Sequence, residues 1–525
     1  MSPRSPTIGD TRGSRTSSGP LFRVQITACS TDRETTEATP LLPRTEGYHD
    51  SRIRAWRASL DEIWTILSYA VPVISTNFLE YSLVVATVVS LGHLSTVALA
   101  ASSLASMTAS VSGLSIVYGL VSALDSLLPQ AWTSSNPQLV GLWSQRMMVV
   151  ISATIIPILI VWHKAEPILL LLGQEPEVAR LAGLYLKWSS FELHAFAFNN
   201  ISRRYYQSQG LVRVPTMIIM IVAPINAFLQ WLLVWGPDPV RLGFIGAPIA
   251  SAISMNLISL LSIGYGVFFT PRTAWSPISS QCFTGLGVLV RLGIGGVGQT
   301  ASEWWSFDLI ALAASMLGPL ALACQSVLLI MSTVSWQLHS SLGIASSIRI
   351  GNLIGSGDSK RAGFAARISL ALAVALAFVI SSLLMIFRKS WARLFNNDAE
   401  VVSRVAHVMP LLALFQVFDA INSISGGVLR ARGKQFVGAV LNVTAYYVVG
   451  IPFGLLLTFH FKMGLSGIWI GISVALAYAA FIGVWLLLRT DWEQEVMRAR
   501  ERITAGQKTE RRDPECPEAN GEYIS

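Results

Sequence analysis

The chain has 525 residues, of which 52% are hydrophobic and only 13% are charged. This composition is typical of an integral membrane protein and excludes the roughly three soluble domains that the length alone would suggest. The net charge of +8 does not indicate a nucleic-acid partner, because the basic residues lie in inter-helix loops and the C-terminal tail, where membrane proteins carry cytoplasmic positive charge. The four cysteines are scattered without metal-ligand or disulfide spacing, and no metal site is predicted.

The N-terminal tail, residues 1–58, is rich in Ser, Thr, Arg and Pro and is predicted to be disordered. Within it, Glu37 precedes the pair Leu41-Leu42 by four residues. This arrangement resembles an adaptor-read endosomal and vacuolar sorting signal, although so short a match also arises easily by chance. It predicts a sorting adaptor as a partner through Glu37, Leu41 and Leu42. It also favours a vacuolar or lysosomal membrane over the plasma membrane.

Twelve apolar runs of roughly 20–30 residues follow between about residues 66 and 488, separated by short polar turns, and about 20 apolar residues suffice to span a bilayer. The sequence therefore predicts an all-α polytopic membrane protein with twelve transmembrane helices. An even number of spans puts both tails on one side of the membrane. The loops on that side hold more Lys and Arg than the opposite loops, which predicts that both tails are cytoplasmic.

An internal repeat relates the two halves of the membrane region. Shifting the chain by 223 residues places residues 94–100 on residues 317–323 and Asn199 on Asn422. This similarity predicts two pseudo-symmetric six-helix lobes. Their predicted bounds are 59–272 for the N-lobe and 273–488 for the C-lobe, with a cytoplasmic C-terminal tail at 489–525.

Acidic residues lie inside several of the predicted spans. Glu80 falls in span one, Glu303 and Asp308 in span seven, and Asp419 in span ten. An ionisable side chain at membrane depth costs at least ~2.5–3.5 kcal/mol, so its presence indicates a function. The 223-residue shift places Glu80 on Glu303, and no Lys or Arg occurs between residues 293 and 348. These four acids are the predicted sites of cation or proton coupling.

Two interpretations are open for these acids. The favoured one is a protonatable carboxylate in a water-filled cavity, where the low dielectric favours the neutral form. The alternative for Glu303 is a pair with a buried donor. The alternative for Glu80 is a protonated side chain that hydrogen-bonds to Thr76 or Asn77, because span one offers no basic residue to neutralise it.

Several motifs occur in the order that is typical of one transporter family. In the second half these are Glu303-Trp304-Trp305 with Asp308, Gln325-Ser326, the stretch 347–352, the stretch 355–358, and 426–430 with Tyr446-Tyr447. In the first half they are 92–94, 123–125 and Gln130-Ala131. Over residues 67–487 the chain resembles the eukaryotic MATE (multidrug and toxic compound extrusion) transporters.

The resemblance implies two lobes around a central cavity and antiport of a substrate against H+ or Na+. The coupling acids of the family map onto Glu303 and Asp419, and the second acid of span seven onto Asp308. One departure is Ile330, where some animal members carry a Glu, which puts a preference for large organic cations in doubt. Prokaryotic members often have an Asp late in span one, where this chain has aliphatics and Thr87.

Aromatic and amide side chains near these acids are candidates for the substrate cavity. Indole and phenol rings present π faces to flat or cationic compounds, although helix packing or interfacial anchoring explains such rings equally. The predicted cavity residues are Trp304, Trp305, Gln325, Tyr446, Tyr447 and Asn199.

The function predicted from these features is a monomeric secondary antiporter that exports or sequesters small organic compounds in exchange for protons. It needs no cofactor other than the coupling ion, which is H+, with Na+ as a possible alternative. The competing hypothesis is a flippase for lipids or lipid-linked precursors with a related two-lobe fold. A membrane-embedded enzyme is not predicted, because the sequence lacks a His-rich metal cluster, a paired Asp loop and a nucleophile motif.

Overall fold

A computed structural model describes residues 45–395 and 398–510, and the chain from Trp56 onward forms one compact unit. The predicted sorting signal at Glu37, Leu41 and Leu42 lies outside the described residues. Throughout the described ranges the regular structure is helical, without strands. The predicted all-α class is therefore confirmed.

The first half consists of helices with short connections. They are α1 (Thr45–Gly92), α2 (Thr96–Ala109), η1 (Ser110–Leu114), α3 (Ser115–Val121), α4 (Leu124–Trp132), α5 (Leu139–His163), α6 (Ala165–Leu171), α7 (Pro176–Ser208), α8 (Arg213–Trp235), η2 (Gly243–Ile245) and α9 (Gly246–Phe268). The turns η3 (Arg272–Ala274) and η4 (Ser280–Phe283) lead to the second half.

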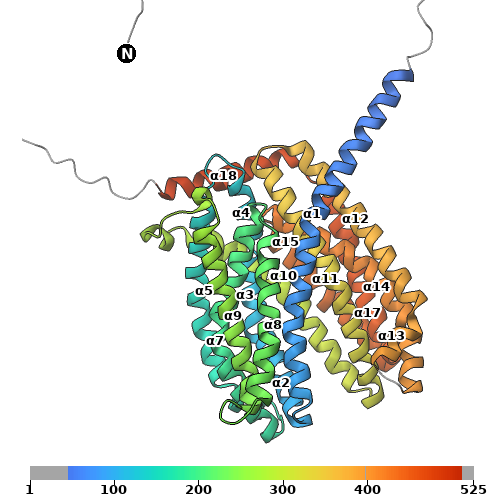
Figure 1. The fold of residues 1–525 in the computed structure, drawn as a ribbon. Coiled ribbons are helices and arrows are strands. Elements are labelled where there is room, and N and C mark those ends of the chain that lie inside the picture. The colour runs from blue at the N-terminus through green and yellow to red at the C-terminus, as the bar shows by residue number, and fades with distance from the viewer. Residues whose placement is uncertain (1–44, 396–397, 511–525) are drawn as a thin grey trace, which may run out of the picture. The chain divides into compact units, whose positions relative to one another are not determined.

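The second half repeats this pattern. It consists of α10 (Leu286–Ser315), α11 (Pro319–Gly355), α12 (Ser359–Ile386), α13 (Arg388–Phe395), α14 (Ala399–Ala431), α15 (Gln435–Val443), η5 (Thr444–Gly450), α16 (Ile451–Leu455), η6 (Leu456–His460), α17 (Leu465–Leu488) and α18 (Trp492–Glu510). Within the compact unit, Figure 1 shows α5, α7, α8 and α9 gathered on one side and α12, α14 and α17 on the other.

Ten of the described helical segments are long and apolar enough to cross a membrane. The helices α7 and α10 are not among the ten, yet they contain 33 and 30 residues and occupy the predicted positions of spans four and seven. Both carry charged residues inside their length, which lowers their hydropathy. The predicted number of twelve spans is reached only if these two helices are counted.

Each half has its own buried apolar cluster. Trp162 belongs to the cluster of the first half, and Trp469 and Tyr446 belong to the main cluster of the second half. A further cluster joins Ile66 and Ala70 of α1 to α11, α12 and α14. The part of α1 around Ile66 and Ala70 therefore packs against the second half of the chain.

The two halves approach each other closely where α3 contacts α10. A Cβ atom added to Gly119 of α3 would overlap the backbone of Val297, and one added to Gly296 of α10 would overlap the backbone of Gly119. Only glycine allows these two backbones to touch. On the same side of the molecule, Thr133 donates a hydrogen bond to the carbonyl of Asn352 at 2.7 Å, and Gln130 donates one to that of Ala431 at 2.7 Å.

Candidate functional site

Two acids of the second half, Glu303 of α10 and Asp419 of α14, each meet a polar side chain of α11. The indole Nε1 of Trp336 donates a hydrogen bond to Oε1 of Glu303 at 3.1 Å. The imidazole Nδ1 of His339 lies 3.3 Å from Oδ2 of Asp419. Trp336 and His339 are three residues apart, so they project from the same face of α11. One helix face thus positions both carboxylates.

The two carboxylates form a single electrostatic site. Their negative charges lie within interaction range of each other, and Arg430 lies within range of Glu303. In the part of the chain that the structure describes, neither acid forms an ion pair with Lys or Arg. Because the partners of both acids are neutral donors or a histidine, the site can change its net charge by taking up a proton.

The alternative interpretation of Glu303 was that its carboxylate pairs with a buried donor. Glu303 does have a donor, and that donor is the Trp336 indole, which was not foreseen from the sequence. An indole N–H hydrogen-bonds to a carboxylate without cancelling its charge. The hydrogen bond orients Glu303 and leaves its ability to bind a proton intact.

Asp308 faces different neighbours from Glu303, as the five-residue separation on α10 requires. Its Oδ2 atom is buried without a hydrogen-bond partner. Tyr447 of η5 lies within electrostatic range of Asp308, and the Tyr447 hydroxyl is also buried without a partner. The structure therefore separates Asp308 and Tyr447 from the contacts of Glu303 with α11.

Glu80 forms an ion pair that neither interpretation of this residue included. Its Oε2 atom lies 2.6 Å from Nη2 of Arg203 on α7, and 26% of the Glu80 side chain is exposed. Span one itself contains no basic residue beside Glu80, and Arg203 comes from span four. Of the two nearby residues proposed as partners, Thr76 instead bonds to Thr216 at 2.8 Å and Asn77 donates to Ser341 at 2.9 Å.

The predicted cavity residues of the second half occupy several distinct places. Trp304 stacks at a tilt on Tyr118 of α3, with ring centroids 5.8 Å apart, so it lies at the contact between the halves. Trp305 is partly exposed. Gln325 is buried and accepts a hydrogen bond from the Trp469 indole at 3.0 Å, while its Nε2 atom has no partner.

Asn199 is the predicted cavity residue of the first half. Its Nδ2 atom donates to the carbonyl of Met255 at 2.9 Å, and its Oδ1 atom accepts from the Ser259 hydroxyl at 2.8 Å. Both amide atoms are thus engaged in joining α7 to α9. The structure does not bring Asn199 together with the acids of the second half.

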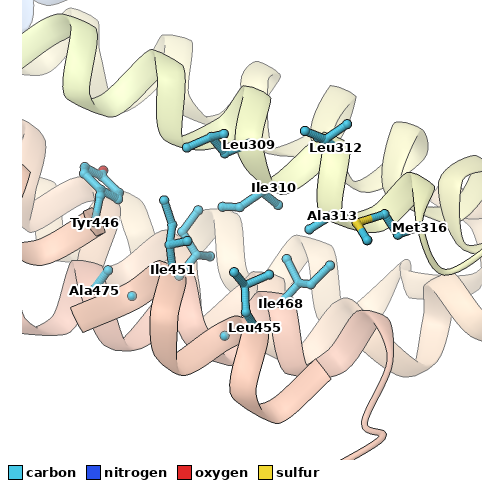
Figure 2. A pocket seen from close by; sticks show the side chains of 13 residues that line it. Leu309, Ile310, Leu312, Ala313, Met316, Tyr446, Ile451, Leu455, Ile468 and Ala475 are labelled. Carbon is cyan, nitrogen blue, oxygen red and sulfur yellow. The ribbon is translucent and has the colours of Figure 1, made fainter. Parts of the chain in front are cut away.

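An apolar cavity lies between α10 and the segment formed by η5, α16 and α17. It has a volume of about 200 Å³, and Figure 2 shows side chains of α10 facing Ile451, Leu455 and Ile468 across it. Tyr446 lies at one end of this view. Tyr446 is also within electrostatic range of Glu303 and Asp419, so this ring connects the apolar cavity with the acid site.

The π-helical segments η5 and η6 flank this cavity. Such segments interrupt the regular hydrogen bonding of a helix and are frequent at functional sites. Tyr446 and Tyr447 both belong to η5, and this insertion sets which way each ring points. A sequence pattern based on 3.6 residues per turn does not contain that information.

Comparison with known proteins agrees with these features. The MatE family model matches residues 72–232 and 297–456. An uncharacterised transporter of Schizosaccharomyces pombe is 37% identical over 85% of this chain and 82% of its own length. Multidrug and toxin extrusion protein 2 of Mus musculus is 32% identical over 85% of this chain and 78% of its own length. The crystal structure of the eukaryotic MATE transporter AtDTX14 superposes with a TM-score of 0.80 at 32% identity, covering 85% of this chain and 99% of that structure.

Proposed function

Because the chain belongs to the MATE family of multi-pass membrane transporters, we propose that it is a secondary antiporter that moves organic compounds in exchange for protons. The observation that carries this proposal is the pair of acids formed by Asp419, which is buried, and Glu303, which is partly buried; among the described residues neither forms an ion pair with Lys or Arg. A buried carboxylate of this kind is stabilised either by a proton or by a cationic substrate. The two therefore compete for one site, and this competition is the basis of exchange.

The choice of H+ over Na+ rests on the atoms around the acids. A bound Na+ needs several oxygen ligands, whereas Trp336 directs an N–H group at Glu303 and His339 places a ring nitrogen at Asp419. An N–H donor repels a metal cation but tolerates a protonated carboxyl group. This arrangement favours protons as the coupling ion.

The apolar cavity beside Tyr446 supports an organic substrate. Its volume of about 200 Å³ is below the ~300–1,000 Å³ of a pocket that encloses a drug-sized ligand. It therefore suits an apolar portion of a substrate whose polar portion lies toward the acids.

The test uses purified protein in liposomes with an imposed pH gradient and a panel of fluorescent organic compounds. Wild-type protein should accumulate at least one of these compounds in exchange for protons when the pH gradient is imposed. The variant Glu303→Gln should insert normally and lose this uptake, because its amide has no charge to cycle. The matched control is Glu400→Gln on the exposed start of α14, where the pair with Arg404 is a surface contact. Undiminished proton-driven uptake by Glu303→Gln, or uptake driven only by Na+, would refute the proposal.

We further propose that the protein resides in a vacuolar or lysosomal membrane with both tails in the cytoplasm. The support is the Leu41-Leu42 pair and the distribution of basic loops. In that membrane the transporter would move cytosolic compounds into an acidic lumen, using the outward-directed proton gradient.

A further inference from the structure

His339 is the least expected member of the acid site. Its side chain is 0% exposed, and that of its neighbour Asp419 is 5% exposed. Buried histidines normally use both ring nitrogens in hydrogen bonds. Among the residues that the structure describes, only Nδ1 of His339 has a partner, and Nε2 is buried without one.

The geometry points to a proton-binding role that rests on the proposed function: we propose that His339 and Asp419 together form one proton-accepting pair of the exchange cycle. In the neutral ring, Nδ1–H donates to Oδ2 of Asp419, and the lone pair of Nε2 is unused. A proton that binds to Nε2 produces an imidazolium beside a carboxylate. The pair then changes from a net charge of −1 to zero, and no other bond is broken.

The carboxylate makes this protonation possible in a buried place. Burial disfavours a charged imidazole, but an opposite charge at hydrogen-bond distance offsets that cost. The proton is then shared by two groups in direct contact, so it belongs to the pair and not to either residue alone.

The helices packed near the pair carry other charged and titratable groups. Glu303 of α10 adds a second negative charge, and Gln416, one turn before Asp419 on α14, is buried with both amide atoms unpartnered. The other acidic or phenolic groups on these helices are Tyr446 of η5, Tyr478 of α17 and Glu80 of α1, which is paired with Arg203. The basic groups are Arg430 of α14, Arg349 of α11, and Lys360, Arg361 and Arg367 near the start of α12. None of the basic groups forms an ion pair with Asp419 among the described residues.

The first experiment needs no substrate. Wild-type protein in lipid nanodiscs, with isotope-labelled histidine, is titrated from pH 8 to pH 5 and followed by infrared difference spectroscopy. The variant His339→Asn retains a donor at the position of Nδ1 but has no second nitrogen to protonate. We expect wild type to show an imidazolium band that is coupled to a buried carboxylate band, and we expect the variant to lose the coupled signal. The control His407→Gln changes an exposed histidine of α14 and should retain it.

The second experiment measures the pH profile of exchange in liposomes. His339→Asn should lose at least about half of the pH dependence between pH 6 and 8, because the ring nitrogen that accepts the proton in the proposed pair is absent. If wild type exchanges against protons while His339→Asn keeps both the wild-type profile and the infrared signal, His339 is only a positioning residue and the inference is wrong. If the coupled signal is present but no proton-driven exchange occurs, the proposed function fails and the pair stands. Should His339→Asn not fold, absence of the coupled band from wild type itself would overturn the inference.

Discussion

The C-terminal helix α18 depends on one buried carboxylate, and this contact allows a quantitative prediction. Glu495 is almost fully buried, and its Oε1 atom lies 3.0 Å from Arg432, 2.8 Å from Lys434 and 3.0 Å from Arg498. Around it, Val496 packs into a cluster of the second half, and Ile503 packs against the cluster of the first half. The helix therefore contacts both halves on one side of the molecule.

The variant Glu495→Gln removes the negative charge and leaves the cations in place. The side chain of Arg432 is 5% exposed, whereas those of Lys434 and Arg498 are 33% and 49% exposed. Removing one partner of a buried pair costs about 3–5 kcal/mol, and exposed pairs add little. Because glutamine retains one acceptor, we take the lower end, about 3 kcal/mol. At about 1.4 kcal/mol per tenfold change, the docked state of α18 should become less favoured by about 150-fold.

Hydrogen–deuterium exchange of the α18 amides measures this change, since local undocking exposes them. In Glu495→Gln their protection should fall by about two orders of magnitude, while that of α5 and α14 stays unchanged. The control Glu493→Gln, an exposed position two residues earlier, should have wild-type protection. A loss of less than about tenfold in Glu495→Gln would show that Glu495 does not hold the helix in place.

The same contact has a defined pH dependence. Burial by itself raises the pKa of Glu495, but hydrogen bonds and charges from Lys434 and Arg432 outweigh it and hold the pKa below the ordinary value. A lowered pKa in the folded state means that the stabilisation is complete above the ordinary glutamate pKa of about 4.3 and is lost as the pH falls below it. Protection of α18 in wild type should therefore be constant from pH 8 to about 5, when corrected for intrinsic exchange, and decline only in stronger acid.

Three further predictions concern other contacts. Glu80→Gln should lower thermal stability by about 1–3 kcal/mol because Arg203 loses its partner, and the double variant with Arg203→Gln should recover part of this loss in a double-mutant cycle. Equal melting temperatures of wild type and Glu80→Gln would contradict the ion pair. Gly119→Ala should cost about 1–3 kcal/mol by overpacking the contact of α3 with α10, again measured by thermal unfolding in detergent. Replacing Leu41 and Leu42 by alanine should shift a fluorescent fusion toward the cell surface, and an unchanged distribution would dismiss the sorting signal.

The sequence was sufficient for the features that depend on single helices. Apolar run lengths predicted the all-helical membrane fold, and the unusual charges in span seven drew attention to Glu303. These properties follow from the cost of placing polar groups in a bilayer, which any one helix must meet on its own. Asp419 was likewise visible as an acid inside span ten, the family resemblance implied a coupling role for it, and the structure has it within electrostatic range of Glu303.

The contacts between helices could not be predicted in the same way. Trp336, His339 and Arg203 were missed because each acts on an acid of another helix. Which residues meet depends on the rotation and tilt of neighbouring helices, and a helix that is apolar on most sides gives no periodic pattern from which to read its rotation. The i, i+3 spacing of Trp336 and His339 can be seen in the sequence and places both on one face of α11. Only the positions of α10 and α14 in the structure show that this face meets the two acids.

The internal repeat explains why the second half carries the coupling chemistry that we propose. The 223-residue shift places Glu80 on Glu303, and it also places Arg203 on Gly426. In the structure Glu80 is paired with Arg203, while a Cβ atom at Gly426 would touch Gln299, which precedes Glu303 by one turn of α10. Gly426 itself supplies no cation there, and Arg430, whose Nη1 atom would lie 3.4 Å from that Cβ atom, is engaged in an ion pair with Asp125 at 3.3 Å. The acid of the first half therefore has a permanent counter-charge in direct contact. Glu303 instead has the neutral Trp336 indole as its hydrogen-bond partner, which leaves the charge of Glu303 to be neutralised by a proton in the exchange that we propose.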